Sequence, residues 1–538
     1  MSPEFPWWRH SVVYQVYLRS FADGDGDGTG DIGGLRSRLP YLASLGVDAL
    51  WVNPWYESPL NDGGYDVVDY RSIKSLFGTL DEAKLLIVDA VRLGLRLLVD
   101  LVPNHTSSEH RWFRAAIEAG PGSAERARYH FLPGMGHGGE SPPNDWTSVF
   151  GGPAWTRVPD GDWYLHTFDV SQPDLNWANP EVRAEFIDIL RFWLDLGASG
   201  FRVDVAHGLV KDPDHPDGGD DVTEVMAMPH TARYPMWDQP GVHEIVREWR
   251  SVLDEYPDTV MIAEAWLPDW SRLARYVRPG EYHQVFDFLF LQSPWDARSV
   301  KGTIIEALGA TRDVGALPTW VLSNHDVMRH ATRYGLPRDV KPKEWLLEGD
   351  RALLDEKMGM LRARAALLVM LALPGSAYLY QGEELGLPEA YDLPAVVLDD
   401  PVWERSGHTD KGRDGCRVPI PWTPDGPSFG FGRGGSWLPQ PGDWGTLSVQ
   451  SQDGVPGSTL ELYREAIRLR SETMRDDEVL DWLELGDDIL AFRRGSGVSC
   501  LANYGREPMA LPDGDVVISS GPVEGDALPP DTTVWLAP

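Results

Sequence analysis

Ionisable side chains occur at the ends of several apolar segments, where a folded chain normally avoids them. In GFRVDVAHG (200–208), Arg202 and Asp204 are two residues apart, so on a strand both side chains point to the same face. Similar groups end other apolar segments: Asp100, Asn104, His105, Glu264, His325 and Asp326. Burying so many such groups is costly unless they are paired, and catalytic residues gather at the strand ends of barrel enzymes. We therefore predict a catalytic cluster, although helix capping explains any one aspartate alone equally well.

Eight short apolar segments alternate with helical patterns and would position this cluster. They are SVVYQVY (11–17), DALWVN (48–53), LRLLVDLV (95–102), FRVDV (201–205), VMIAEA (260–265), HQVFDF (283–288), TWVLSNH (319–325) and SAYLYQG (376–382). One of the intervening helices is predicted over 80–94, with Thr79 as its cap. This alternation predicts an α/β fold, a parallel (β/α)8 TIM barrel, whose carboxyl strand ends surround one pocket. An open doubly wound sheet would give a similar pattern.

Other segments do not fit the barrel repeat. A stretch rich in Gly, Pro, His and Trp follows the third strand, and a long loop region, 383–450, follows the eighth. After an amphipathic segment at 458–474, strand-like runs alternate with turns. We therefore expect a catalytic barrel over 1–102 and 171–474, an inserted small domain over 103–170 and a C-terminal antiparallel β-sandwich domain over 475–538.

Composition restricts the class of partner. The 538 residues include 48 Lys and Arg against 82 Asp and Glu, so the net charge is −34. Such a charge disfavours nucleic acid and anionic membranes and suits a small neutral substrate. Only Cys416 and Cys500 are cysteines, which argues against a disulfide framework. With no apolar signal core and no long apolar run, the sequence predicts a cytoplasmic protein without a membrane segment.

Five motifs now point to a family. DLVPNH (100–105), GFRVDVAHG (200–208), AEAW (263–266) and LSNHD (322–326) resemble, in order and spacing, the signature regions of the α-amylase superfamily of glycoside hydrolases, family 13. QPDLNW (172–177) is similar to a further motif of the oligo-1,6-glucosidase and α-glucosidase branch. The resemblance runs from Trp7 to about residue 425. It implies the same barrel, with an inserted domain and a terminal β domain.

The resemblance assigns catalytic roles to three carboxylates. It implies that Asp204 is the nucleophile, that Glu264 is the general acid and then the base, and that Asp326 binds sugar hydroxyls and favours the oxocarbenium-like state. Arg202 would keep Asp204 ionised through an opposite charge at short range. Two carboxyl groups about 5–5.5 Å apart give retention of configuration at the sugar.

The same resemblance implies a substrate-binding set. Its members are Asp62, Tyr65, His105, Phe150, Phe168, Arg202, Val205, His325, Glu384 and Arg413. A turn with a packed tyrosine is the alternative for NDGGYDV, and a core position is the alternative for each phenylalanine. Arg417 is expected to be structural. Val205 matches members that accept α-1,6 links, whereas the Ala206-His207 pair departs from their usual pattern.

The loop DGDGDGTGD (23–31) forms a second constellation. Carboxylates at every second position resemble the first half of an EF-hand loop, and related enzymes hold a cation here. We expect a structural Ca²⁺ or Mg²⁺ and no organic cofactor; the alternative is an acidic solvated loop. The predicted ligands are Asp23, Asp25, Asp27, the Thr29 carbonyl and Asp31.

The sequence therefore predicts a retaining, exo-acting α-glucosidase that acts on small neutral oligosaccharides as a monomer or homodimer. Transglucosylation, or action on sucrose- or trehalose-type disaccharides, is the alternative activity. A non-catalytic relative is the alternative class. Transporter heavy chains of that kind have lost the acids and carry a membrane helix, whereas this chain keeps all three carboxylates.

Overall fold

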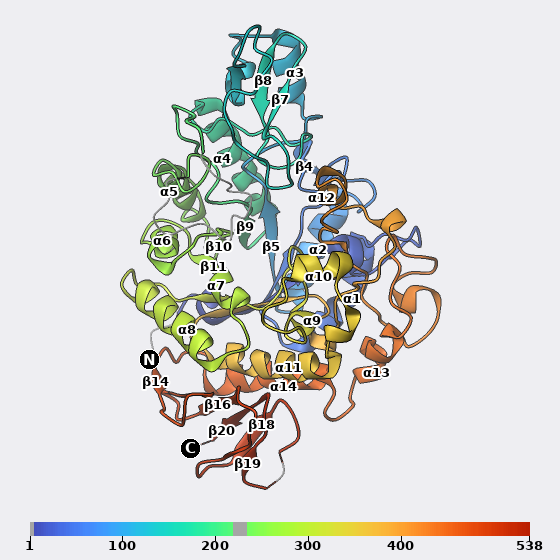
Figure 1. Ribbon diagram of the computed structural model, residues 1–538, viewed down its shortest axis with the longest axis vertical. Coiled ribbons are helices and arrows are strands. Elements are labelled where there is room, and N and C mark those ends of the chain that lie inside the picture. The colour runs from blue at the N-terminus through green and yellow to red at the C-terminus, as the bar shows by residue number, and fades with distance from the viewer. Residues whose placement is uncertain (1–4, 219–233, 524, 538) are drawn as a thin grey trace.

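Eight parallel strands close into a barrel at the centre of the protein (Figure 1). The computed structural model describes residues 5–218, 234–523 and 525–537. The barrel strands are β1 (Val12–Val16), β2 (Ala49–Val52), β5 (Arg96–Leu101), β9 (Gly200–Val203), β10 (Val260–Ala263), β11 (Gln284–Asp287), β12 (Thr319–Val321) and β13 (Ser376–Tyr380). Because β1 pairs in parallel with both β2 and β13, the sheet is closed. The predicted barrel is confirmed, and the open sheet is wrong.

Helices surround this barrel and connect its strands (Figure 1). The longer ones are α1 (Ile32–Leu45), α2 (Leu80–Arg92), α4 (Pro180–Asp195), α5 (Val242–Leu253), α8 (Ala297–Arg312), α11 (Glu356–Ala372) and α14 (Thr459–Thr473). The shorter ones include α6 (Trp270–Leu273), α7 (Phe288–Gln292), α9 (His330–Arg333), α10 (Pro342–Glu348), α12 (Pro401–Arg405) and α13 (Val449–Gln452). Thr79 caps α2 as predicted: its side chain accepts from the Glu82 N–H while the Glu82 carboxylate accepts from the Thr79 N–H.

The segment after β5 forms a separate small sheet at one end of the molecule (Figure 1). Helix α3 (Arg111–Ala119) lies beside the strands β6 (Phe131–Pro133), β8 (Asp162–Leu165) and β7 (Trp155–Arg157), which pair in this order. Before it, β3 (Tyr56–Glu57) and β4 (Asp69–Ile73) form a short hairpin. An isolated bridge between His105 and Asp174 ties the two ends of the insertion together beside the barrel.

A C-terminal antiparallel sheet packs against α11, and its strand β15 also contacts α8 (Figure 1). Its strands are β14 (Leu480–Trp482), β15 (Ile489–Arg494), β16 (Ser499–Asn503), β20 (Thr532–Leu536) and β18 (Val516–Ser519), in this spatial order. A second ladder joins β17 (Met509–Ala510) to β19 (Ala527–Leu528). The expected antiparallel β domain is confirmed, while the residue limits given above for the domains stay predictions.

Close packing at the start of β9 requires glycine. Gly200 has φ +143°, and a Cβ there would lie 1.9 Å from the Val260 carbonyl oxygen of β10. Any side chain would therefore push apart the two strands whose ends hold Asp204 and Glu264. Among the described residues, no helix is long and apolar enough to cross a membrane.

Candidate functional site

One buried guanidinium joins carboxylates from three neighbouring strands. Arg202 of β9 lies 2.9 Å from Asp100 Oδ1 of β5 and 2.7 Å from Asp204 Oδ1. Its second terminal nitrogen lies 2.7 Å from Glu264 Oε2, just beyond β10. Because β5, β9 and β10 are adjacent in the barrel, their carboxyl ends bring these four side chains together as predicted.

Opposing effects act on the carboxylates of this cluster. Burial raises the pKa of Asp204 well above its usual range; Arg202 opposes this rise, and the charge of Glu264 adds to it. Burial likewise raises the pKa of Asp100 to about 6. Arg202 therefore favours the ionised form of Asp204, as expected, while burial and the Glu264 charge oppose it, because one cation is shared by three buried carboxylates.

Backbone and indole N–H groups fix the Glu264 carboxylate. The Val205 N–H donates to Oε2 at 3.1 Å, and the Trp266 indole donates to Oε1 at 3.1 Å. Trp266 is itself held by stacking on Phe288, with ring centroids 3.7 Å apart. The Val205 backbone has φ +45°, a left-handed conformation that is costly for a β-branched residue. The chain therefore accepts strain immediately after Asp204, in the turn that binds Glu264.

Arg413 gathers a second group of carboxylates. It lies 2.7 Å from Asp62, 3.1 Å from Asp326 and 2.6 Å from Asp400. Arg417, expected to be structural, also reaches Asp326 at 3.0 Å. Burial alone would raise the pKa of Asp326, but the positive charges of Arg413 and Arg417 hold it well below its usual range. Asp326 therefore stays ionised.

Stacked rings join the two groups. The rings of Tyr65 and His325 lie 5.3 Å apart and nearly parallel, and the Tyr65 hydroxyl donates to Asp100 Oδ2 at 3.0 Å. His325 Nε2 lies 3.3 Å from Asp326 Oδ2. On the other side, His105 Nε2 lies 3.1 Å from the Tyr65 carbonyl oxygen. Burial lowers the pKa of both histidines, so both are neutral and can each donate and accept one hydrogen bond.

Aromatic side chains of the inserted region border this site. Phe168 lies 5.3 Å from His105 and 5.6 Å from Phe150, measured between ring centroids. The Arg413 guanidinium lies 5.0 Å from the centroid of the Phe150 ring. Both phenylalanines therefore contact predicted site residues, beyond serving as core.

Glu384 is the predicted residue that the structure does not bring to the site. Its Oε1 accepts hydrogen bonds from the Tyr14 and Tyr41 hydroxyls at 2.7 and 2.8 Å, and its Oε2 accepts from the Gly382 N–H. These partners lie in β1, in α1 and at the end of β13, and Glu384 is fully buried among them. The expectation that it contacts substrate is corrected to a structural role, because all its bonds join barrel elements.

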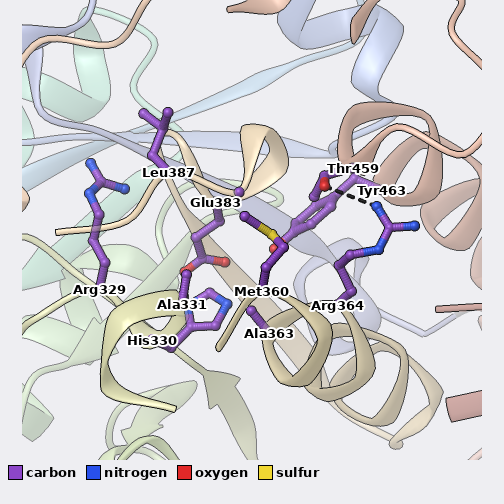
Figure 2. A pocket seen from close by; sticks show the side chains of 11 residues that line it. Arg329, His330, Ala331, Met360, Ala363, Arg364, Glu383, Leu387, Thr459 and Tyr463 are labelled. Atoms are coloured by element: carbon purple, nitrogen blue, oxygen red, sulfur yellow. Dashed lines mark hydrogen bonds and ion pairs between the residues drawn. The ribbon is translucent and has the colours of Figure 1, made fainter. Parts of the chain in front are cut away.

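The neighbouring Glu383 faces a small cavity instead (Figure 2). The cavity, of about 10 Å³, is also lined by His330, Met360, Arg364 and Tyr463. Neither Glu383 oxygen has a hydrogen-bond partner that meets ordinary geometry among the described residues. Burial raises the pKa of Glu383 to about 8, so the side chain is a neutral acid at pH 7.

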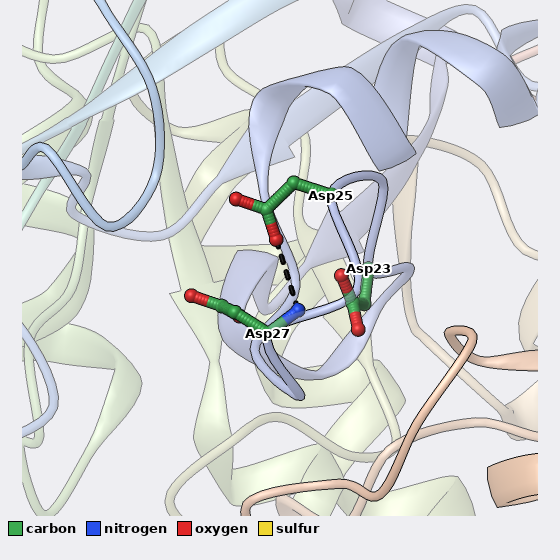
Figure 3. A group of neighbouring side chains, drawn as sticks. All are labelled: Asp23, Asp25 and Asp27. Carbon is green, nitrogen blue, oxygen red and sulfur yellow. Dashed lines mark hydrogen bonds between the residues drawn. The ribbon is translucent and has the colours of Figure 1, made fainter.

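The acidic loop brings three of its predicted ligands together (Figure 3). Carboxylate oxygens of Asp23, Asp25 and Asp27 lie within 4.8 Å of one another, which fits the hard oxygen ligands of a divalent cation. The structure does not add Asp31 to this group: it caps α1, with one oxygen accepting from the Gly34 N–H and the other from the Gly24 N–H.

Several side chains at the site were missed from the sequence. They are Gln15, Asn53, Gln172, Asp400, His207 and Trp237. Gln172 is part of the QPDLNW motif, which was a usable signal: its amide donates to Asp62 Oδ2 at 3.0 Å. Asp400 lies in the long loop region and carries no local signal.

His207 and Trp237 stack with ring centroids 4.9 Å apart. Neither nitrogen of the His207 ring nor the indole N–H of Trp237 has a hydrogen-bond partner of ordinary geometry in the described part of the chain. The nearby Glu264 carbonyl already accepts from the Ala206 N–H at 2.9 Å. Burying polar atoms without a hydrogen-bond partner costs stability. A ligand hydroxyl or a water that bonded to these ring nitrogens beside Glu264 would therefore be stabilised.

Comparison with known proteins extends over nearly the whole chain. Residues 15–477 match the family described as alpha amylase, catalytic domain. The chain is 35% identical over 536 residues to a probable alpha-glucosidase of Rhizobium meliloti (strain 1021), covering 94% of this chain and 91% of the relative. It is 34% identical over 498 residues to the oligo-1,6-glucosidase of Parageobacillus thermoglucosidasius, covering 87% and 84%. A solved alpha-glucosyl transfer enzyme superposes with a TM-score of 0.86 at 33% identity, covering 99% of both chains.

Proposed function

The chain belongs to the α-amylase family of glycoside hydrolases and is a glycosidase, and from this premise we propose that it is a retaining, exo-acting α-glucosidase. The observation that carries the proposal is the pair Asp204 and Glu264, held at neighbouring strand ends by one arginine. Relatives named alpha-glucosidase and oligo-1,6-glucosidase support a short α-glucoside as substrate.

The proposed reaction has two displacements. Asp204 attacks the anomeric carbon while Glu264 protonates the departing oxygen, so that a glucosyl ester forms and the leaving sugar departs as an alcohol. Water, deprotonated by Glu264, then cleaves the ester and releases glucose with its configuration retained. The first step needs one acid and one ionised nucleophile, and the Arg202 guanidinium favours the ionised form of Asp204.

The second carboxylate group supports action at a chain end. Asp62, Asp326 and Arg413 are tied together by short ion pairs, and Gln172 and His105 lie beside Asp62. Such a group of hydrogen-bonding side chains is suited to the hydroxyls of a terminal glucose. In this proposal, Asp326 and the two neutral histidines hold the hydroxyls, and Tyr65 lies against the sugar ring.

The leaving-group side combines an apolar and a polar wall. The Val205 side chain packs with Trp237 and Met236 in one apolar cluster, while His207 lies next to Trp237 and near Glu264. An apolar wall discriminates weakly between acceptors, by about 1–3 kcal/mol per methylene. We therefore infer a permissive enzyme that cleaves both α-1,4 and α-1,6 disaccharides.

Glucosyl transfer is the alternative activity. The solved alpha-glucosyl transfer enzyme supports it, because a covalent intermediate can be captured by a sugar hydroxyl as well as by water. A structural divalent cation in the 23–31 loop completes the proposal; Asp23, Asp25 and Asp27 would hold it, far in sequence from the reacting groups. The cellular compartment and the number of subunits stay predictions.

The proposal is tested by separating the two displacements. Asp204→Asn and Glu264→Gln are each expected to reduce turnover of maltose by several orders of magnitude, while Glu118→Gln, an exposed acid on α3, keeps normal rates. With Glu264→Gln, an aryl α-glucoside that has a good leaving group should still glucosylate Asp204, because little acid assistance is needed. Mass spectrometry of the trapped protein would then show an adduct of one glucosyl group. Near-normal turnover of maltose by either variant would refute the assignment.

A further inference from the structure

Helix α2 is apolar on its solvent face as well as on its barrel face. Ala83, Leu86, Ile87 and Ala90 are buried, as expected for an amphipathic helix. On the opposite face, Leu85 is 48% exposed and Val88 is 43% exposed. A surface helix normally carries polar side chains there, and exposed apolar groups that cluster mark interaction sites.

Four of the exposed residues of α2 form one line along the helix, and Val91, 58% exposed, lies to one side of this line. Asp81, Leu85, Val88 and Arg92 are separated by four, three and four residues, the spacing of a helix–helix seam. Read along the helix, this line, here called the α2 seam, is acidic, apolar, apolar and basic. The side chain of Asp81 is 87% exposed and that of Arg92 is 74% exposed. Asp81 pairs with the exposed Lys84 and Arg92 with the half-buried Asp89, each one turn away at 3.0 Å; Asp89 also pairs with Arg36 at 2.6 Å.

We propose that the α2 seam binds a second copy of this chain across a two-fold axis, with the two α2 helices antiparallel. In this register Asp81 meets Arg92 of the second copy, and Leu85 meets its Val88. A two-fold axis repeats each contact, so the interface carries two ion pairs around four apolar side chains. The parallel arrangement would place like charges opposite each other and is disfavoured. The seam is its own complement, which argues for a second copy over a partner of different chemistry.

The overall charge of the chain supports the same choice of surface. At −34, two copies repel each other, and an acidic face would add to this repulsion. The α2 seam has equal numbers of acidic and basic residues, so it adds none. One helix from each copy makes a small interface, and we therefore expect a concentration-dependent dimer with Kd on the order of micromolar.

Sedimentation velocity of the full-length chain, from about 1 to 100 μM at low salt, tests the proposal. The wild-type chain should shift from monomer to dimer within this range. Leu85→Glu is expected to weaken association at least tenfold, because it places a charge opposite Val88. Leu353→Glu changes an exposed apolar residue outside the α2 seam and is the matched control; it should associate like the wild type.

The antiparallel register is tested by charge exchange. Asp81→Arg faces Arg92 of the second copy and should weaken association, whereas the double variant D81R/R92D restores opposite charges and should recover it. Melting temperature and turnover of an aryl α-glucoside control for folding, because α2 lies outside the catalytic cluster. A wild-type chain that stays monomeric at 100 μM overturns the proposal. Normal dimerisation of Leu85→Glu, or failure of Leu353→Glu to dimerise, also overturns it. The same holds if D81R/R92D associates no more tightly than Asp81→Arg. Loss of glucosidase function with dimerisation intact would instead count against the proposed activity alone.

Discussion

Replacing Arg202 by methionine is expected to destabilise the barrel in a pH-dependent way. The side chain is almost fully buried and is within 2.9 Å of three carboxylates, so its removal leaves these groups without a cation. Removing one partner of a buried ion pair typically costs about 3–5 kcal/mol. An unfolding entropy near 2.1 cal/mol/K per residue amounts to about 1 kcal/mol/K for a barrel of several hundred residues. We therefore expect the melting temperature to fall by about 3–5 °C near pH 7.

The pH dependence has a definite sign. Burial already raises the pKa of Asp100 to about 6 and that of Asp204 well above its usual range, and loss of Arg202 raises both further. A carboxyl group with a higher pKa in the folded than in the unfolded state is most stabilising below the unfolded value, and this contribution is lost as the pH rises. The variant should thus lose stability more steeply than the wild type between pH 5 and pH 8.

Differential scanning calorimetry of both chains at pH 5, 6, 7 and 8 makes the comparison. Arg202→Lys is the matched variant: it keeps a cation but not the fork that reaches three carboxylates, so it should lie between the other two proteins. A melting difference that is constant within one degree over this pH range would refute the reasoning. An Arg202→Lys chain as unstable as Arg202→Met would show that packing, and not charge, explains the loss.

Three further predictions follow from other parts of the molecule. Chelation of divalent cations should lower the melting temperature by several degrees while activity at low temperature survives, because a ligand of the native state stabilises it by mass action; calorimetry with and without EDTA tests this. Val205→Thr adds a hydroxyl with almost no change in shape and should raise the kcat/KM ratio of maltose over isomaltose more than twofold; a ratio unchanged within twofold means that another residue reads the linkage. Because the pKa of Glu383 is about 8, the free energy of unfolding of the wild type should fall by about 1.4 kcal/mol per pH unit between the unfolded pKa of glutamate and pH 8. Glu383→Gln should remove this loss. Identical pH profiles of the melting temperature for the two proteins would contradict a buried neutral acid.

The order of the apolar segments along the chain, and the ionisable residues at their ends, determined most of the fold and the centre of the site. Each barrel strand is a buried apolar run, and strand ends in a parallel barrel converge whatever the loops do. The placement of Arg202, Asp204 and Glu264 in one cluster therefore follows from their positions at the ends of neighbouring runs. The Thr79 cap is equally local, because its partner is three residues away.

Tertiary structure decided which partner each group takes. Glu383 and Glu384 are neighbours in sequence, but one short turn points the first into a cavity and the second to two tyrosines. Asp31 has the same chemistry as Asp23, yet the start of α1 uses its oxygens for capping.

The charge states at the site depend on the same long-range contacts. Arg413 pairs with Asp62 across 351 residues of chain, and Arg202 is shared by three carboxylates from different strand ends. Local periodicity fixes where a strand ends and which side chains lie there. The direction of a loop side chain and the pKa of a buried group depend on burial and on charges brought from distant segments, and these exist only once the barrel has closed.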